Sequence, residues 1–359
     1  MVSQVWQGVP WTHAVTFTEG DGDLAILVIT GGDPNVLDLT DQRDLAVLAN
    51  LPVATLFHIP NQPLFDDLWE DDLIAFTFDQ FLETDDETWP LLLPMVKSVI
   101  RAMDVLQEAT EGRLKRFVVT GLSKRGWTTW LSAAVNDRRI VGIAPMVIDN
   151  LNVQVQMKHQ LDTWGYYSEQ IEPYTERNLQ EKAQSIKGQR LARMIDPYSY
   201  RSQITVPTLI VNGSNDPYWQ VDALSQYWDG LTQPKWASIV PNAGHLLGDQ
   251  VQSRAALSAF AKSLAGKFQM PEPGWAFSVE GSRVRAFGSG SDDIALWLAQ
   301  SETLDFRDSE WVEFKTESPD YDLPLSQEVN SAAMLAFNYD IGGCEFTLTS
   351  PVAVFPSRQ

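Results

Sequence analysis

The sequence has a single cysteine, Cys344, and only four histidines in 359 residues. One cysteine excludes an intrachain disulfide framework and any zinc or iron–sulfur site built from several cysteines. The histidines are too few for a histidine-rich metal site. No apolar run reaches the ~18 residues that a transmembrane helix needs, so we expect no insertion into a membrane.

Positive charge is also scarce, since 26 Lys and Arg face 47 Asp and Glu, a net charge of −21. Such a chain repels polyanions, which argues against nucleic acid as a partner. The first residues, MVSQVWQGVPWTH, lack the basic and apolar regions of a secretory leader. We therefore expect a cytoplasmic protein, or a secreted or periplasmic one if a leader was removed before residue 1.

The first 266 residues alternate apolar, strand-like runs with segments of helical periodicity. The predicted buried strands are 24–30, 53–59, 116–121, 141–148, 208–213 and 236–242. This alternation predicts an α/β fold with a mainly parallel sheet covered on both faces. Functional sites of such sheets lie at the carboxyl ends of the strands.

Two regions depart from this alternation of strands and helices. The polar and aromatic segment 151–200 is too long for a bare loop, and we interpret it as a helical lid inserted into the fold. Beyond the connector at 267–273, apolar and polar residues alternate, as in antiparallel strands of a small β-sandwich. The predicted domains are therefore a catalytic domain at 1–266 and an accessory domain at 267–359.

The most informative local pattern is G-x-S-x-x-G at the end of the strand near residue 121. Ser123 lies between Gly121 and Gly126, where the strand turns into a helix. Small neighbours suit a serine held in a tight strand-to-helix turn, where the N–H of Lys124 can face an oxyanion. A serine that merely caps the helix explains the motif alone equally well.

Two later strand ends carry partners that a serine nucleophile would need. Asp216 follows the strand at 208–213, and His245 follows the strand at 236–242. The order Ser, Asp, His is that of α/β-hydrolases, in which an acid orients the histidine and the histidine activates the serine. Asp149, one strand earlier, is an alternative acid, and we prefer Asp216. The paired glycines Gly31 and Gly32 would supply the second oxyanion donor.

Other residues near the predicted strand ends are candidates for a substrate pocket. These candidates are Arg125, His58, Trp164, Tyr166 and Tyr167. Arg125 could attract a substrate carboxylate, but pairing with a nearby acid that fixes the turn is the preferred interpretation. A structural role is likewise preferred for His58. The acidic stretches 66–72 and 83–87 fit solvated helix ends better than a calcium loop.

Several longer segments resemble one family. The runs GLSKRGWTTWLSAA, DPYSYR, LIVNGSND and VPNAGH are similar to the PhoPQ-activated pathogenicity-related protein family. The resemblance covers most of 1–266 and continues through 296–311. It implies an α/β-hydrolase-type fold with Ser123, Asp216 and His245 as the triad, and its members resemble both peptidases and esterases.

The sequence thus predicts a serine hydrolase that cleaves an ester or amide bond of a small molecule or peptide, with no metal or organic cofactor. The alternative is a non-catalytic binding or interaction protein on a hydrolase scaffold, because a fold does not guarantee turnover. The sequence predicts no particular oligomeric state.

Overall fold

The computed structural model describes residues 1–280, 283–315, 320–324 and 328–357. Residues 281–282, 316–319, 325–327 and 358–359 of the predicted accessory domain lie outside the described residues. The chain forms two compact units. The first consists of Met1–Val153, Glu169–Thr208 and Leu231–Pro234, and the second of Gln154–Ser168, Leu209–Gly230 and Lys235–Gln359.

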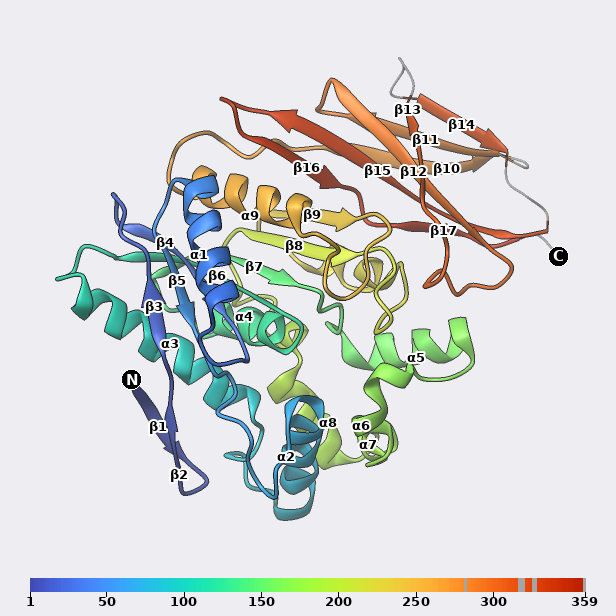
Figure 1. The fold of residues 1–359 in the computed structure, drawn as a ribbon. Coiled ribbons are helices and arrows are strands. Elements are labelled where there is room, and N and C mark those ends of the chain that lie inside the picture. Colours follow the sequence, from blue (N-terminus) through green and yellow to red (C-terminus); the bar gives the residue numbers. More distant parts are fainter. Residues whose placement is uncertain (281–282, 316–319, 325–327, 358–359) are drawn as a thin grey trace. The chain divides into compact units, whose positions relative to one another are not determined.

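The sheet of the first unit runs in the order β7-β6-β4-β5-β3 (Figure 1). Its strands are β3 (Val15–Phe17), β4 (Leu24–Ile29), β5 (Val53–Leu56), β6 (Arg116–Leu122) and β7 (Ile140–Met146). Neighbours among β4 to β7 are parallel, and β3 is antiparallel to β5. Every residue of β5 is buried, as expected for a strand covered on both faces.

The longer helices of the first 150 residues lie between these strands in the chain. They are α1 (Val36–Ala49), α2 (Glu70–Thr84), α3 (Leu92–Ala109) and α4 (Lys124–Ala134). Helix α4 packs against β6, β7 and α3, and α1 packs against β5. The strands β1 (Val2–Trp6) and β2 (Val9–Thr12) form a separate antiparallel pair. These elements confirm the α/β pattern expected for this part of the chain.

The inserted segment 151–200 is helical, as predicted, and it is divided between the two units. In the first unit it forms η1 (Glu169–Ile171), α6 (Glu172–Thr175), α7 (Leu179–Lys182), α8 (Ile186–Ile195) and η2 (Pro197–Tyr200). Helix α5 (Val153–Trp164) belongs, after its first residue, to the second unit.

The sheet of the second unit runs in the order β13-β12-β15-β16-β9-β8, with β17 also paired to β15. Its strands are β8 (Thr208–Gly213, of which Thr208 falls in the first unit), β9 (Lys235–Val240), β12 (Asp293–Ser301), β13 (Val312–Lys315), β15 (Asn330–Asp340), β16 (Glu345–Thr349) and β17 (Ala353–Phe355). Helix α9 (Val251–Leu264) packs against β9 and β16. The short turns η3 (Ala223–Gln226) and η4 (Trp228–Gly230) follow β8.

The bounds of the second unit differ from the predicted boundary near residue 267. The physical reason is a strand pairing, because Thr349 of β16 lies opposite Ala237 of β9 in one antiparallel ladder. The C-terminal strands therefore extend the sheet that contains β9.

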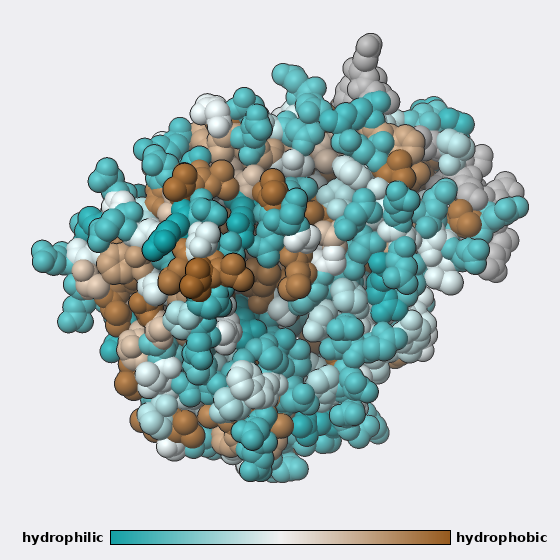
Figure 2. All heavy atoms as spheres, in the orientation of Figure 1, coloured by the Kyte–Doolittle hydropathy of each residue, from teal (hydrophilic) through white to brown (hydrophobic). Residues whose placement is uncertain are grey.

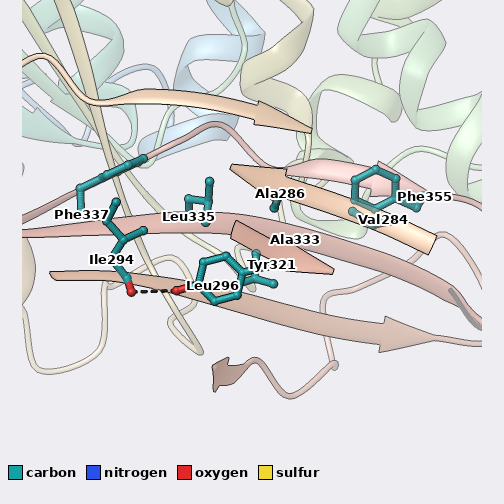
Figure 3. Close-up of a cluster of buried hydrophobic side chains, with 9 residues drawn as sticks. All are labelled: Val284, Ala286, Ile294, Leu296, Tyr321, Ala333, Leu335, Phe337 and Phe355. Carbon is teal, nitrogen blue, oxygen red and sulfur yellow. Dashed lines mark hydrogen bonds between the residues drawn. The ribbon is translucent and has the colours of Figure 1, made fainter. Parts of the chain in front are cut away.

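A second antiparallel sheet, β10-β11-β14, packs on the C-terminal strands. It consists of β10 (Gly274–Glu280), β11 (Arg283–Ser289) and β14 (Asp320–Pro324). Buried and exposed residues alternate along β11, so one face of this sheet meets the core. Apolar side chains from β11, β12, β14, β15 and β17 form a cluster that includes Leu335, Phe337 and Tyr321, whose hydroxyl donates to the Ile294 carbonyl at 2.8 Å (Figure 3).

The surface is mostly hydrophilic on the face drawn in Figure 2, with smaller apolar groups between the hydrophilic residues. None of the helices in the described part of the chain has the length and apolar character that a membrane span requires.

The buried cluster of the second unit generates a stability prediction. Phe337 is fully buried there, whereas Phe287 of β11 has 45% of its surface exposed. Phe337→Ala should lower the free energy of unfolding by about 3–5 kcal/mol, because it leaves a cavity between the two sheets. Phe287→Ala is the matched control with a much smaller loss, and equal shifts in urea unfolding midpoints would contradict this view of the core.

Candidate active site

Ser123 occupies a strained turn between β6 and α4. Its backbone has φ 57° and ψ −123°, a conformation that is costly for a residue with a side chain. The N–H of Ser123 donates to the Met146 carbonyl at 2.8 Å, and its carbonyl accepts from Trp127 at 2.9 Å. The Ser123 side chain makes no capping bond to α4, all of whose residues are described. This geometry fits a nucleophile held in a strand-to-helix turn and excludes the simple helix-cap interpretation.

The positions on both sides of Ser123 have no room for a side chain larger than that of glycine. A Cβ at Gly121 would lie 2.7 Å from the Cβ of Arg125, and a Cβ at Gly126 would lie 2.7 Å from the Met146 carbonyl oxygen. Such contacts are shorter than real Cβ atoms tolerate, so the G-x-S-x-x-G motif reflects close packing of the turn.

Arg125 and Lys124 anchor this turn to the start of α2. The Arg125 guanidinium donates to both carboxylate oxygens of Glu70, at 2.7 and 2.6 Å, and its Nε donates to the Ile59 carbonyl at 2.6 Å. The Lys124 ammonium lies 2.8 Å from Asp71. Arg125 thus has the acid-pairing role that the sequence analysis preferred over a substrate contact.

The Glu70 carboxylate is held in its charged form. Burial by itself would raise the pKa of Glu70, but the hydrogen bonds and charge of Arg125, with help from Gln62 and Lys124, outweigh it and lower the pKa to about 2. The predicted acidic stretch 66–72 is therefore not simply solvated, because Glu70 and Asp71 neutralise the two cations beside Ser123.

Gly31, the first of the two glycines after β4, lies against the same guanidinium, whereas a Cβ at Gly32 would have no atom within 4 Å. A Cβ at Gly31 would come within 1.8 Å of Nη2 of Arg125, so a larger residue would displace this guanidinium from its contacts with Glu70. The Gly32 carbonyl accepts from the N–H of His58 at 3.0 Å. The first unit therefore brings the glycine loop and the serine turn together through Arg125. Lys124 is the first residue of α4, a position whose backbone N–H has no intrahelical acceptor in an α-helix.

His58 has contacts on both ring nitrogens. Nε2 lies 2.5 Å from the Gln62 carbonyl, and Nδ1 lies 3.1 Å from Asp33. The His58 carbonyl contacts Nδ1 of His13 at 3.0 Å. These contacts agree with the structural role that the sequence analysis preferred.

In the second unit, Asp216 and His245 form a hydrogen-bonded pair. Nδ1 of His245 lies 2.8 Å from Oδ2 of Asp216, which is only 8% exposed. Because a carboxylate only accepts hydrogen bonds, Nδ1 is the donor in this contact, and in a neutral imidazole the lone pair is then on Nε2. Nε2 is buried and has no hydrogen-bond partner among the described residues of its own unit.

Tyr218 supports this pair from two directions. Its backbone N–H donates to Oδ1 of Asp216 at 2.9 Å. Its ring stacks on the imidazole of His245, with centroids 4.2 Å apart and planes inclined by 27°. The acid and the histidine are therefore fixed in both position and orientation.

The aromatic residues of the insertion lie near a cation. Arg307 lies 4.1 Å above the Trp164 ring and donates to the Tyr166 hydroxyl at 2.8 Å. Tyr167 follows at once in the chain and is partly buried. Gln160 of α5 donates to the Tyr218 carbonyl at 2.9 Å, so α5 is bonded to the residues beside Asp216.

The structure thus assembles the predicted site residues in two groups. The first unit holds Ser123, Lys124, Arg125, Gly31, Gly32, His58 and Asp149. The second unit holds Asp216, His245, Trp164, Tyr166 and Tyr167. Asp216 is the acid that contacts His245, while Asp149 is a buried residue of the other unit. The pairing of Ser123 with His245 stays a prediction.

Sequence reasoning missed Glu70, Tyr218 and Arg307. Glu70 was hidden because acids are common at helix starts. Tyr218 had one usable signal, since it stands two residues after the predicted acid, where an Asp side chain often accepts a backbone N–H.

The Glu70 contacts predict a pH-dependent contribution to stability. Since the pKa of Glu70 is about 2 in the folded protein against an ordinary value of 4.5, its carboxylate stabilises the fold above pH 4.5 and loses this effect as the pH falls toward 2. Glu70→Gln should therefore lower the free energy of unfolding most at neutral pH, with the deficit shrinking below pH 4.5, as measured by denaturant unfolding.

The matched control for that prediction is Glu108→Gln, at an exposed position of α3. It should change the unfolding free energy by less than about 0.5 kcal/mol at any pH. A Glu70→Gln deficit that stays constant down to pH 2 would contradict the assignment.

Comparisons with known proteins agree with this architecture. The family model for the PhoPQ-activated pathogenicity-related protein matches residues 1–307. Autocrine proliferation repressor protein A of Dictyostelium discoideum is 33% identical over 302 residues, which are 77% of this chain and 60% of that protein. This chain therefore matches about three fifths of that relative's length.

A solved structure supports the fold. The acetyl xylan esterase from Paenibacillus sp. R4 is similar with a TM-score of 0.50 and 14% identity, over 71% of this chain and 79% of that one. At this identity the likeness concerns the fold alone, and it confirms the predicted α/β-hydrolase fold. Since the family model matches most of its residues, the chain belongs to the PhoPQ-activated pathogenicity-related protein family.

Proposed function

We propose that the protein is a serine hydrolase that cleaves an ester or amide bond through an acyl-enzyme intermediate. The observation that carries this proposal is the Asp216–His245 pair, whose geometry leaves Nε2 of the histidine as the basic nitrogen. The strained and uncapped turn at Ser123 supports it independently. The α/β-hydrolase fold is compatible with such chemistry without proving it.

In the proposed reaction, Oγ of Ser123 attacks the substrate carbonyl carbon while Nε2 of His245 takes the hydroxyl proton. Asp216 stabilises the resulting imidazolium and keeps its orientation. The backbone N–H of Lys124 and that of Gly31 or Gly32 would bind the oxyanion of the tetrahedral intermediate. The imidazolium then gives its proton to the leaving alcohol or amine, and the acyl-enzyme forms.

Water completes the cycle. His245 removes a proton from the water as it attacks the acyl carbonyl, and the Ser123 oxygen leaves with that proton. No metal or organic cofactor takes part in this scheme. The aromatic residues Trp164, Tyr166 and Tyr167 are the proposed contacts for apolar substrate groups.

Labelling by a fluorophosphonate tests the nucleophile. The wild-type protein should be labelled covalently, and Ser123→Ala should lose all labelling because the attacking oxygen is gone. Ser202→Ala, which changes an exposed serine of the same unit, should be labelled like the wild type. A well-folded wild-type protein that resists the probe would favour the non-catalytic binding protein instead. Comparing the turnover of short-chain esters with that of aminoacyl and dipeptidyl amides then shows whether the enzyme cleaves ester or amide bonds.

The choice of acid has its own test. Asp216→Asn should lower kcat by about four orders of magnitude, because the amide favours the wrong tautomer of His245. Asp149→Asn should retain activity within about tenfold. The two variants are compared by kcat on a substrate that the wild type hydrolyses, and the reverse ranking would make Asp149 the acid.

A further inference from the structure

Segment 306–311, which lies outside the predicted catalytic domain, is bonded to the turn that carries Asp216. The side-chain amide of Asn215, the residue before Asp216, is directed into this segment. Its Nδ2 carries two hydrogens and lies 2.7 Å from the Ser309 carbonyl, 2.9 Å from the Arg307 carbonyl and 3.4 Å from the Phe306 carbonyl. One amide group thus contacts three carbonyls of the same short segment.

The same segment is bonded to the loop that carries His245. The Asn242 side chain pairs with the backbone of Trp311 in both directions. Nδ2 of Asn242 donates to the Trp311 carbonyl at 2.9 Å, and the Trp311 N–H donates to Oδ1 of Asn242 at 2.7 Å. An amide paired in this way fixes both the distance and the orientation of the two chains.

Ser214 connects the two asparagines. Its hydroxyl donates to Oδ1 of Asn215 at 2.6 Å and accepts from the backbone N–H of Asn242 at 2.9 Å. The backbones of the two loops are also in direct contact, because the Asn215 N–H donates to the Ala243 carbonyl at 2.9 Å. A Cβ at Gly213 would lie 2.3 Å from that same carbonyl oxygen.

The segment itself is firmly anchored. Phe306 and Trp311 are each 2% exposed. The Ser309 hydroxyl donates to the Gln300 carbonyl of β12 at 3.0 Å, and Arg307 is stacked on Trp164. The two loops already bond each other directly, and a rigid segment bonded to both adds a further constraint on their relative position.

We infer that segment 306–311 is a clamp that fixes the Asp216–His245 pair, and that Asn215 and Asn242 are positioning residues acting through it. The C-terminal strands thereby become part of the catalytic apparatus. The effect on turnover rests on the proposed function, whereas the effect on the Asp216–His245 hydrogen bond does not.

The hydrogen bond is tested by proton NMR. The Nδ1 proton shared with Asp216 should give a resonance far downfield of the backbone amides, assigned by its loss in His245→Ala. Asn215→Ala and Asn242→Ala should broaden or abolish this resonance. Asn330→Ala is the matched control. Asn330 belongs to the same unit, and its side chain also bonds to the backbone, accepting from the Ser357 N–H at 3.0 Å. This variant should leave the resonance intact.

Kinetics on a hydrolysed substrate supply the second readout. Each clamp variant should lower kcat by about 10- to 100-fold, as expected for a misplaced catalytic group, with KM changed less than about threefold. Asn330→Ala should lose thermal stability comparably while keeping kcat. A clamp that serves stability alone would move the unfolding temperature of all three variants and leave kcat and the resonance unchanged.

The outcomes separate the two proposals. If the resonance and kcat survive in both clamp variants, the clamp is wrong. If the resonance is absent from the wild-type protein, the Asp216–His245 bond and the clamp both fail. If the resonance responds as expected but no wild-type preparation reacts with fluorophosphonate, the clamp stands and the proposed hydrolase function fails.

Discussion

The backbone conformation of Ser123 is the constraint on which the first unit depends. A residue with φ 57° and ψ −123° stays in that conformation only if its surroundings leave no alternative. Gly121 and Gly126 provide the space, and Arg125 provides the fixed neighbour. The guanidinium is in turn immobilised by Glu70 and the Ile59 carbonyl. The energetic cost of one turn is thus met by contacts with residues far apart in the sequence.

The contacts of Arg125 and Lys124 with acidic residues also determine the net charge around Ser123. A chain with a net charge of −21 nevertheless places Lys124 and Arg125 beside its candidate nucleophile, and Glu70 and Asp71 balance them. A developing oxyanion in the proposed mechanism would therefore meet backbone N–H dipoles rather than a mobile cation. Dipoles held in place need no rearrangement as charge develops, which is the more efficient way to stabilise a transition state.

Much of the fold could be predicted from local sequence, and the supporting contacts could not. Buried apolar runs identified β4 to β9, and the positions of Asp216 and His245 followed from the strand ends. Glu70 lies 55 residues before Arg125, and the hydrophobic periodicity of a sequence does not indicate which distant charged residues form a pair. The alternation after residue 274 predicted antiparallel strands, but it carries no information about their neighbours. The alternation of apolar and polar residues therefore could not predict the pairing of Thr349 with Ala237.

The C-terminal strands show why a boundary drawn from composition does not locate a functional unit. Composition changes near residue 267 because the strands that follow are antiparallel and only partly buried, not because contacts end there. Asn215 and Asn242 cross that boundary through hydrogen bonds to 306–311. Short polar side chains bonded to backbone hold loops at fixed distances, and such bonds are weak singly but cooperative as a connected set. A candidate acid and histidine carried on two separate loops gain from this arrangement the fixed geometry that proton transfer demands.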